Sequence, residues 1–295
     1  MLLSKNYLVE TKVPELPEVE TVRLGLEQSI LGKKISKVEV FHPRATNPKS
    51  IAPLDSLTGS KIISVNRRGK FLWLELNRPE VLLAHLGMSG QFIVSERNAK
   101  VEKHMRIRIS LNTKAFEVRF IDQRTFGWLS VDQSSAGIPN SAAHIALDIF
   151  DPKFNRNEVK ANFLQRKTEI KRALLNQEIM SGVGNIYADE SLWLAKIHPE
   201  RACSELTDLE LELLLDSVAE VMGAALKAGG TSFDEQYKNV NGESGYFDIE
   251  LCAYGQDGEP CSRCGTAIRR IAFANRSSHF CPKCQVNRRL KKRKV

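Results

Sequence analysis

Pro14 and Glu15 are the residues of this sequence with the clearest capacity for covalent chemistry. A proline at a free N-terminus carries a secondary amine with a pKa of about 8, well below the value of about 10.4 for lysine, so much of it is uncharged near neutral pH. Attack of this amine on an aldehyde-level carbon gives an iminium that cannot lose its charge by releasing an N–H proton, and such a cation is an electron sink. Glu15 is the neighbour suited to move protons.

Pro14 can react in this way only if residues 1–13 are absent from the working chain, because an amide nitrogen has no free lone pair. Val13 suggests how that could arise, since a GUG start codon inside a longer reading frame appears as valine. Initiation there would give a methionine that is readily removed before proline, and residues 1–13 would be a non-native leader. The alternative is a genuine N-terminal extension, with Pro17 in the first turn of an ordinary helix.

Four cysteines have the spacing of a zinc site. They form two CxxC pairs with 16 residues between them. Each pair can supply two thiolates from one tight turn, and four thiolates leave no open position for catalysis. The sequence therefore predicts one structural zinc ion held by Cys261, Cys264, Cys281 and Cys284. A β-hairpin is expected between the pairs, and its arginines suit phosphate contact; they are Arg269, Arg270 and Arg276.

Length and composition predict a soluble protein of about two domains, with 295 residues, 42% hydrophobic and 26% charged. No apolar run is long enough to cross a bilayer, and residues 1–10 make a poor signal peptide. The lack of a signal peptide, together with cysteines expected to be reduced, favours residence in the cytoplasm. The net charge of +8 suggests a polyanionic partner, but six positive charges lie in residues 288–294. That tail is either a solvated, disordered end or an auxiliary nucleic-acid-binding segment.

The elements that must position these residues follow from hydrophobic periodicity. A helix is predicted over residues 18–31, and short β-rich runs typical of a sandwich or barrel follow it from about residue 35 to residue 131; examples are 61–66, 71–76, 81–86, 106–111 and 116–121. A turn-rich segment at 139–152 indicates a domain boundary. Helices are predicted beyond it, the last capped by Thr207, at 157–164, 169–175, 186–195 and 208–227. Residues 231–245 have the composition of a mobile loop.

The segment SGVGNI at residues 181–186 predicts a tight turn entering a helix, with Asn185 at the cap. Backbone N–H groups exposed at such a helix start are a natural seat for phosphate. The turn is too short for a nucleotide-binding P-loop. Two further segments stand out: RRGK at 67–70 precedes an apolar strand, and HLGMSG at 85–90 places Met88 between glycines, so that it projects or packs in the core.

The motifs occur together and in order, and with them the chain resembles the bacterial formamidopyrimidine-DNA glycosylases, which excise 8-oxoguanine from DNA. The resemblance runs over residues 14–285. Its motifs are PELPEVET at 14–21, RRGK at 67–70, HLGMSG at 85–90, DQRTFG at 122–127, SGVGNIYADE at 181–190, GYF at 245–247, and the two cysteine pairs.

The resemblance implies an α+β multidomain fold with three parts. These are an N-terminal β-sandwich with flanking helices (14–145), a helix–two-turn–helix DNA-binding domain (150–248) that contains a loop closing over the lesion (231–245), and a zinc finger with a β-hairpin (249–285). The leader at 1–13 and the basic tail at 286–295 have no counterpart in the family. The partner is double-stranded DNA with oxidised bases or abasic sites. The chain is expected to act as a monomer, without a diffusible cofactor.

The same resemblance assigns roles to individual residues. Pro14 is the Schiff-base nucleophile at the sugar C1′, Glu15 the proton donor and Glu18 their support. Lys70 contacts phosphate beside the damaged nucleotide and assists proton transfer. Three residues fill the gap left by the extruded base: Met88, Arg124 and Phe126. Three contact backbone phosphates: His104, Asn185 and Arg276.

These roles imply a bifunctional base-excision repair enzyme, a glycosylase and abasic-site lyase for oxidised purines that works by β,δ-elimination. One departure concerns the family run DPRRFG, which here reads DQRTFG at residues 122–127, so opposite-base preference or turn rigidity can differ. Two alternatives remain. One is a glycosylase of the endonuclease VIII type for oxidised pyrimidines, and the other is a non-catalytic DNA-binding zinc protein, if residues 1–13 are retained.

Overall fold

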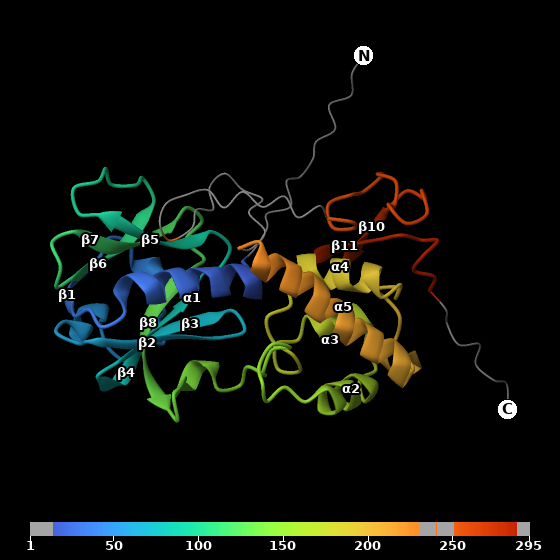
Figure 1. Cartoon of the computed structure of the whole chain (residues 1–295), viewed down its shortest axis with the longest axis horizontal. Coiled ribbons are helices and arrows are strands. Elements are labelled where there is room, and N and C mark those ends of the chain that lie inside the picture. The colour runs from blue at the N-terminus through green and yellow to red at the C-terminus, as the bar shows by residue number, and fades with distance from the viewer. Residues whose placement is uncertain (1–13, 230–239, 241–250, 288–295) are drawn as a thin grey trace, which may run out of the picture.

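The molecule has a β-rich half and a helical half that meet along the first helix. The computed structural model describes residues 14–229, 240 and 251–287. In Figure 1 the β-rich half lies on the left and the helical half on the right, with α1 (Leu16–Ile30) running from beside α5 toward the sheets. Within the described residues, no helix is long and apolar enough to cross a membrane.

Helix α1 starts two residues earlier than the sequence predicts. Pro17 lies in its first turn, as expected, and the Glu18 carboxylate accepts a hydrogen bond from the Glu15 backbone N–H at 2.9 Å, which satisfies one N–H at the helix start. The buried face carries Val19, Val22, Leu26 and Ile30 at helical spacing. Burial of this face fixes α1 onto the sheets and holds its first turn at the junction of the two halves.

Two antiparallel sheets form the β-rich half, and they confirm the predicted sandwich. One has the order β1-β6-β7-β5 and the other β2-β3-β4-β8-β9. One core cluster includes side chains from both sheets and from α1, and Phe120 and Leu72 are among them. The strands are β1 (Ile35–Val40), β2 (Ile62–Arg68), β3 (Phe71–Leu76), β4 (Arg78–His85), β5 (Gly90–Glu96), β6 (Met105–Leu111), β7 (Phe116–Asp122), β8 (Trp128–Ser135) and β9 (Ile138–Pro139).

The helical half begins after the last strand, and its helices surround a separate apolar core that includes Phe163, Leu192 and Leu214. The Thr207 side chain accepts a hydrogen bond from the Glu210 backbone N–H and caps α5, as predicted. The helices are α2 (Arg156–Leu164), α3 (Ile170–Leu174), α4 (Asn185–Leu194) and α5 (Asp208–Lys227). Short 3₁₀ turns lie at Pro43–Ala45, Leu54–Leu57, Asn140–Ala142 and Cys203–Glu205.

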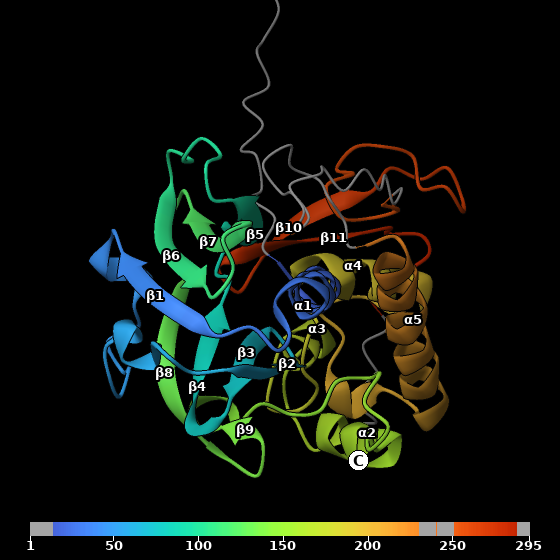
Figure 2. The same ribbon diagram turned by 60° about the vertical axis from the view of Figure 1, so that its left-hand side comes forward.

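The predicted hairpin between the cysteine pairs is present as β10 (Arg269–Phe273) and β11 (Arg276–Phe280). Figure 2 shows this hairpin beside α4, and β11 contacts that helix. Four predicted features fall wholly or partly outside the described residues: the leader at 1–13, the loop at 231–245, the GYF segment at 245–247 and the basic tail at 286–295.

Candidate active site

The Glu15 carboxylate lies at the N-terminus of α4, on the other half of the molecule. Its Oε2 accepts hydrogen bonds from the backbone N–H of Gly184 at 2.6 Å and Tyr187 at 3.4 Å, and its Oε1 accepts one from Ile186 at 2.9 Å. The first N–H groups of a helix have no partner within the helix, and they carry its positive dipole end. Glu15 therefore occupies the position that a capping side chain of α4 would otherwise fill.

The environment of Glu15 favours a carboxyl group that can give up a proton near neutral pH. Its side chain is buried, and this burial raises its pKa from 4.5 to about 7. The charge of Lys70 and the N–H groups of Ile186 and Gly184 act in the opposite direction, and the charge of Glu18 adds to the rise. A pKa near the working pH is the property that a general acid needs.

Glu18 supports this arrangement from one turn further along α1. It holds the Glu15 backbone through Oε2, and its Oε1 accepts a hydrogen bond from the Tyr187 hydroxyl at 2.7 Å. Tyr187 has no role that its sequence pattern predicts, because a buried tyrosine within a helix is indistinguishable from a core residue. Its only signal was its place in the SGVGNIYADE run. Pro14 is also buried, directly before Glu15.

Lys70 lies in the turn between β2 and β3, close to the two glutamates. Burial lowers its pKa, the charges of Glu15 and Glu18 raise it, and the charge of Arg276 lowers it. The structure thus brings together groups from α1, the β2–β3 turn and the zinc-finger hairpin. Arg67 fixes the turn, since its guanidinium donates to the Gly69 carbonyl at 2.9 Å and to Asp148 at 3.0 Å.

His85 is a second residue, near Lys70, to which no sequence pattern assigns a role. Burial and the Lys70 charge lower its pKa to about 4, so the imidazole is neutral at physiological pH. Its Nδ1 accepts a hydrogen bond from the Gly87 backbone N–H at 3.1 Å. The ring stacks on Trp128, with centroids 5.9 Å apart. His85 thereby links the lysine to the loop that carries Met88.

A methyl group at Gly184 is expected to displace the acid. A Cβ there would lie 2.2 Å from the Glu15 carboxyl carbon, while the backbone φ of −121° suits any residue. Gly184→Ala should therefore lower single-turnover base excision by at least tenfold, through lost positioning. Gly223→Ala is the matched control, because its Cβ would only touch Phe150 at 3.8 Å. Equal activity in both variants would contradict the assignment of Glu15.

The three expected gap-filling residues lie on two adjacent loops. Met88 is half-buried between β4 and β5, while Arg124 and Phe126 are exposed between β7 and β8. The Arg124 guanidinium lies over the Phe126 ring, 5.5 Å from its centroid. A Cβ on Gly87 would meet the Phe126 carbonyl carbon at 2.4 Å, so the two loops touch through their backbones.

The expected phosphate contacts are more widely spread. His104 is half-buried ahead of β6, and its carbonyl accepts a hydrogen bond from the Asp122 N–H at 3.0 Å. Arg276 is exposed at the start of β11. The prediction that Asn185 caps α4 is wrong. Gly184 occupies the N-cap position, and the Asn185 amide donates to the Ser277 carbonyl at 3.1 Å, because the Glu15 carboxylate already receives the helix N–H groups.

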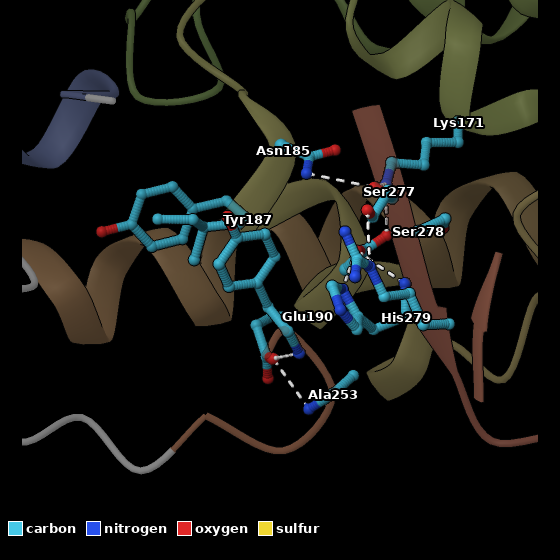
Figure 3. Close-up of polar contacts among 12 residues, drawn as sticks. Lys171, Asn185, Tyr187, Glu190, Ala253, Ser277, Ser278 and His279 are labelled. Carbon is cyan, nitrogen blue, oxygen red and sulfur yellow. Dashed lines mark hydrogen bonds and ion pairs between the residues drawn. The ribbon is translucent and has the colours of Figure 1, made fainter. Parts of the chain in front are cut away.

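A buried ion pair anchors the hairpin that carries Arg276. Figure 3 shows Lys171 and Asn185 directed at Ser277, and Lys171 donates to its carbonyl at 2.9 Å. Lys171 also pairs with Asp189 at 2.6 Å, and Asp189 accepts hydrogen bonds from the Ser278 hydroxyl and the His279 N–H. An unpaired buried charge is costly. The pairing therefore fixes β11 against α3 and α4.

Glu190 makes a second connection between α4 and the zinc-finger region. Its carboxylate accepts hydrogen bonds from the backbone N–H groups of Cys252, Ala253 and Tyr254, at 2.7–2.9 Å. The contact to Ala253 is visible in Figure 3. Burial raises the pKa of Glu190, and the three N–H groups lower it.

The four cysteines meet as the sequence predicts. None of the four forms a disulfide, and their Sγ atoms lie within 4.8 Å of one another. Four thiolates in such a cluster fit one tetrahedral zinc ion, which supplies a structural cross-link and no catalytic position. The Trp193 indole N–H donates to the Cys261 Sγ at 3.4 Å, a contact outside the ligand set that orients a thiolate. Cys203 and Cys252 lie outside the cluster.

Removal of zinc is expected to release the hairpin. Chelation or Cys284→Ser should lower the melting temperature of the finger and weaken phosphate contact through Arg276 by at least tenfold, because structural zinc supplies folding free energy. Zinc content by atomic absorption and duplex binding by fluorescence anisotropy measure the two effects. Cys252→Ser is the control. Undiminished binding by a zinc-free protein would show that the metal does not order this surface.

Comparisons with known proteins agree with these features. A family model for the formamidopyrimidine-DNA glycosylase N-terminal domain matches residues 13–129, one for the H2TH domain matches 145–236, and one for the zinc finger found in FPG and IleRS matches 258–286. The formamidopyrimidine-DNA glycosylase of Nocardioides sp. is 52% identical, over 92% of this chain and 94% of that protein. That of Salinispora arenicola is 51% identical, over 92% and 96%.

Solved structures that are similar to this chain come from the same family. The Lactococcus lactis Fpg in complex with DNA containing an abasic site superposes with a TM-score of 0.82 at 36% identity, over 92% of this chain and 99% of that one. A MutM complex with DNA containing carbocyclic 8-oxo-G superposes with a TM-score of 0.80 at 35% identity, over 92% and 100%. With identities near 50% over most of its length, this chain belongs to the formamidopyrimidine-DNA glycosylase family.

Proposed function

We propose that this protein is a base-excision repair glycosylase and abasic-site lyase that acts on oxidised purines in double-stranded DNA. Family membership supports the glycosylase activity. The solved relatives were captured on DNA with an abasic site or an oxidised base, which supports the partner. The observation that carries the proposal is the buried Glu15 carboxylate, which lies directly after Pro14, close to Lys70, and accepts hydrogen bonds from the first N–H groups of α4.

The reaction begins at the sugar C1′ of the damaged nucleotide. The Pro14 nitrogen forms a bond to C1′, the bond from C1′ to the base breaks, and the base leaves with the electron pair and takes up the proton that the Pro14 nitrogen releases. Glu15 is the proton donor as the deoxyribose ring opens to a cationic imine. Loss of the 2′ proton sends an electron pair toward the iminium and expels the 3′ phosphate, and a second elimination expels the 5′ phosphate. Lys70 assists the proton transfers and contacts the adjacent phosphate.

Separate surfaces then hold and distort the DNA. Met88 and Phe126 enter the stack where the nucleotide leaves it, and Arg124 hydrogen-bonds the widowed base. Phosphates contact three side chains on different elements, and these are His104, Asn185 and Arg276. We assign the domains as 14–145, 150–248 and 249–285, and we place the protein in the cytoplasm as a monomer. The end of the last sandwich strand at Pro139 supports the first border.

Cleavage of paired duplex substrates tests the function. An end-labelled duplex with 8-oxoguanine should yield a one-nucleotide gap with phosphates at both ends. The same duplex with thymine glycol should be cut more slowly. The reverse preference would favour the endonuclease VIII type of activity, and binding without cleavage of either would favour a non-catalytic DNA-binding protein.

A further inference from the structure

One buried carboxylate holds both of the loops that carry the gap-filling residues. Asp122 has no exposed surface at the end of β7. Its Oδ1 accepts hydrogen bonds from the Ser89 hydroxyl and from the Arg124 backbone N–H, and its Oδ2 accepts one from the Gly127 N–H at 2.7 Å. Ser89 follows Met88 directly, and Arg124 and Gly127 lie on either side of Phe126.

The Ser89 hydroxyl closes the connection between the loops. It donates to Asp122 and accepts a second hydrogen bond from the Arg124 N–H at 3.0 Å. The backbones also interlock, since a Cβ on Gly127 would lie 2.8 Å from the Leu86 carbonyl oxygen. The two loops are thus joined by hydrogen bonds and by van der Waals contact. Neither loop can move away from the other without breaking these hydrogen bonds and this contact.

The turn held by Asp122 contains a strained residue. Thr125 has a φ of +58°, a left-handed conformation that is unusual for a β-branched side chain. Such a residue persists only where its surroundings over-determine it. The Asp122 bonds to the N–H groups of Arg124 and Gly127, one on each side of Thr125, supply that constraint. Without them the turn would relax, and the Arg124–Phe126 stack would lose its direction.

We infer that Asp122 and Ser89 are positioning residues that preassemble Met88, Arg124 and Phe126 into one rigid unit before DNA is bound. This inference rests on the proposed function, because the unit is useful only where a base leaves a duplex stack. Neither positioning residue needs to touch DNA. Groups held in place beforehand lose little conformational entropy on insertion, which lowers the barrier to extrusion of the nucleotide.

Ser89→Ala separates positioning from chemistry. The variant should lower kcat/KM on an 8-oxoguanine duplex by about tenfold, the cost of about one buried hydrogen bond. It should cleave a single-stranded abasic oligonucleotide within twofold of the wild-type rate, because a single strand has no stack to fill. Ser50→Ala is the matched control, since the half-buried Ser50 hydroxyl also donates to a carbonyl, of Ala52, and accepts a backbone N–H, of Val131. It should change neither rate.

A binding measurement keeps the inference independent of catalysis. A duplex with a tetrahydrofuran abasic analogue opposite 2-aminopurine reports insertion by fluorescence, and Ser89→Ala should reduce the change at saturating protein. Equal losses on the duplex and single-stranded substrates, or full duplex activity with unchanged fluorescence, would overturn the inference. A wild-type protein that changes the fluorescence but cuts nothing would overturn the proposed function alone. One that does neither would overturn both.

Discussion

Borohydride is expected to trap a chain that begins at Pro14 covalently on lesion-containing DNA, and a chain that retains residues 1–13 is expected to show at least a thousandfold lower trapping rate. The reason is the nitrogen itself, since an amide has no lone pair to form the imine that borohydride reduces. Removal of a nucleophile costs factors of this size in other covalent enzymes. Gel-shifted complex measured against time gives both rates.

The two forms of the chain provide their own control, because they share every residue from Pro14 onward. Mass spectrometry of the native protein tells which form the cell makes. Pro14→Gly in the short form should weaken trapping without abolishing it, since a primary amine remains. Full trapping by protein shown to carry residues 1–13 would refute the assignment of Pro14 as nucleophile.

Glu15→Gln is expected to lower single-turnover excision of 8-oxoguanine by about 10²- to 10⁴-fold, the range for loss of a general acid. The substitution preserves shape but removes the proton. It also turns an N–H₂ group toward the backbone N–H of Gly184 or Ile186, and that N–H then has no acceptor there. Cleavage of a preformed abasic site should fall less, because its sugar is a hemiacetal that opens to the aldehyde without an acid on the enzyme. Glu27→Gln is the control, at a half-buried position on the same helix whose carboxylate pairs with Arg23.

The pH dependence follows from the direction of the Glu15 shift. Its pKa in the folded state is about 7, so the proton donor is present below that pH and excision should decline above it.

The same pKa shift of Glu15 makes the stability of the protein depend on pH. The pKa of Glu15 in the folded state exceeds the unfolded value of 4.5. Glu15 therefore makes its full favourable contribution to the free energy of unfolding below pH 4.5. This contribution, on the order of 3 kcal/mol, is lost as the pH rises through 7. Glu15→Gln should be relatively more stable than wild type above pH 7. A rate for the wild type that stays flat from pH 6 to 9 would contradict the role.

Local sequence patterns predicted much of the fold. The two cysteine pairs predicted the metal cluster, and α5 has the predicted bounds because its apolar spacing and Thr207 cap are both strong signals. The predicted β-rich runs did not include Ile35–Val40, Gly90–Glu96 or Trp128–Ser135, although all three begin within the segment predicted to be β-rich. Gly90–Glu96 and Trp128–Ser135 contain four consecutive buried residues and lack the alternation of a strand with one exposed face, but Arg78–His85 and Phe116–Asp122 share this feature and were among the predicted runs. Alternation alone therefore does not decide which strands the sequence reveals.

The active site was less accessible to sequence reasoning, because its key contacts are long-range. Glu15 bonds residues 169 to 172 positions away, and no spacing rule connects them. The error at Asn185 has the same origin. A cap from its own segment is the local expectation, whereas the structure supplies a carboxylate from α1 instead. The roles of Tyr187 and His85 in the site likewise depend on residues that are distant in sequence and that only the fold brings close to them.

The contact between Glu15 and α4 makes the acidity of this group a property of the assembled molecule. A fragment ending near residue 145 would retain Pro14, Glu15 and Lys70, yet its carboxyl group would face water and return toward ordinary strength. A fragment beginning near residue 150 would contain the N–H groups and nothing to receive them. Neither piece is therefore an autonomous catalyst, and only noncovalent reunion of the two could restore turnover.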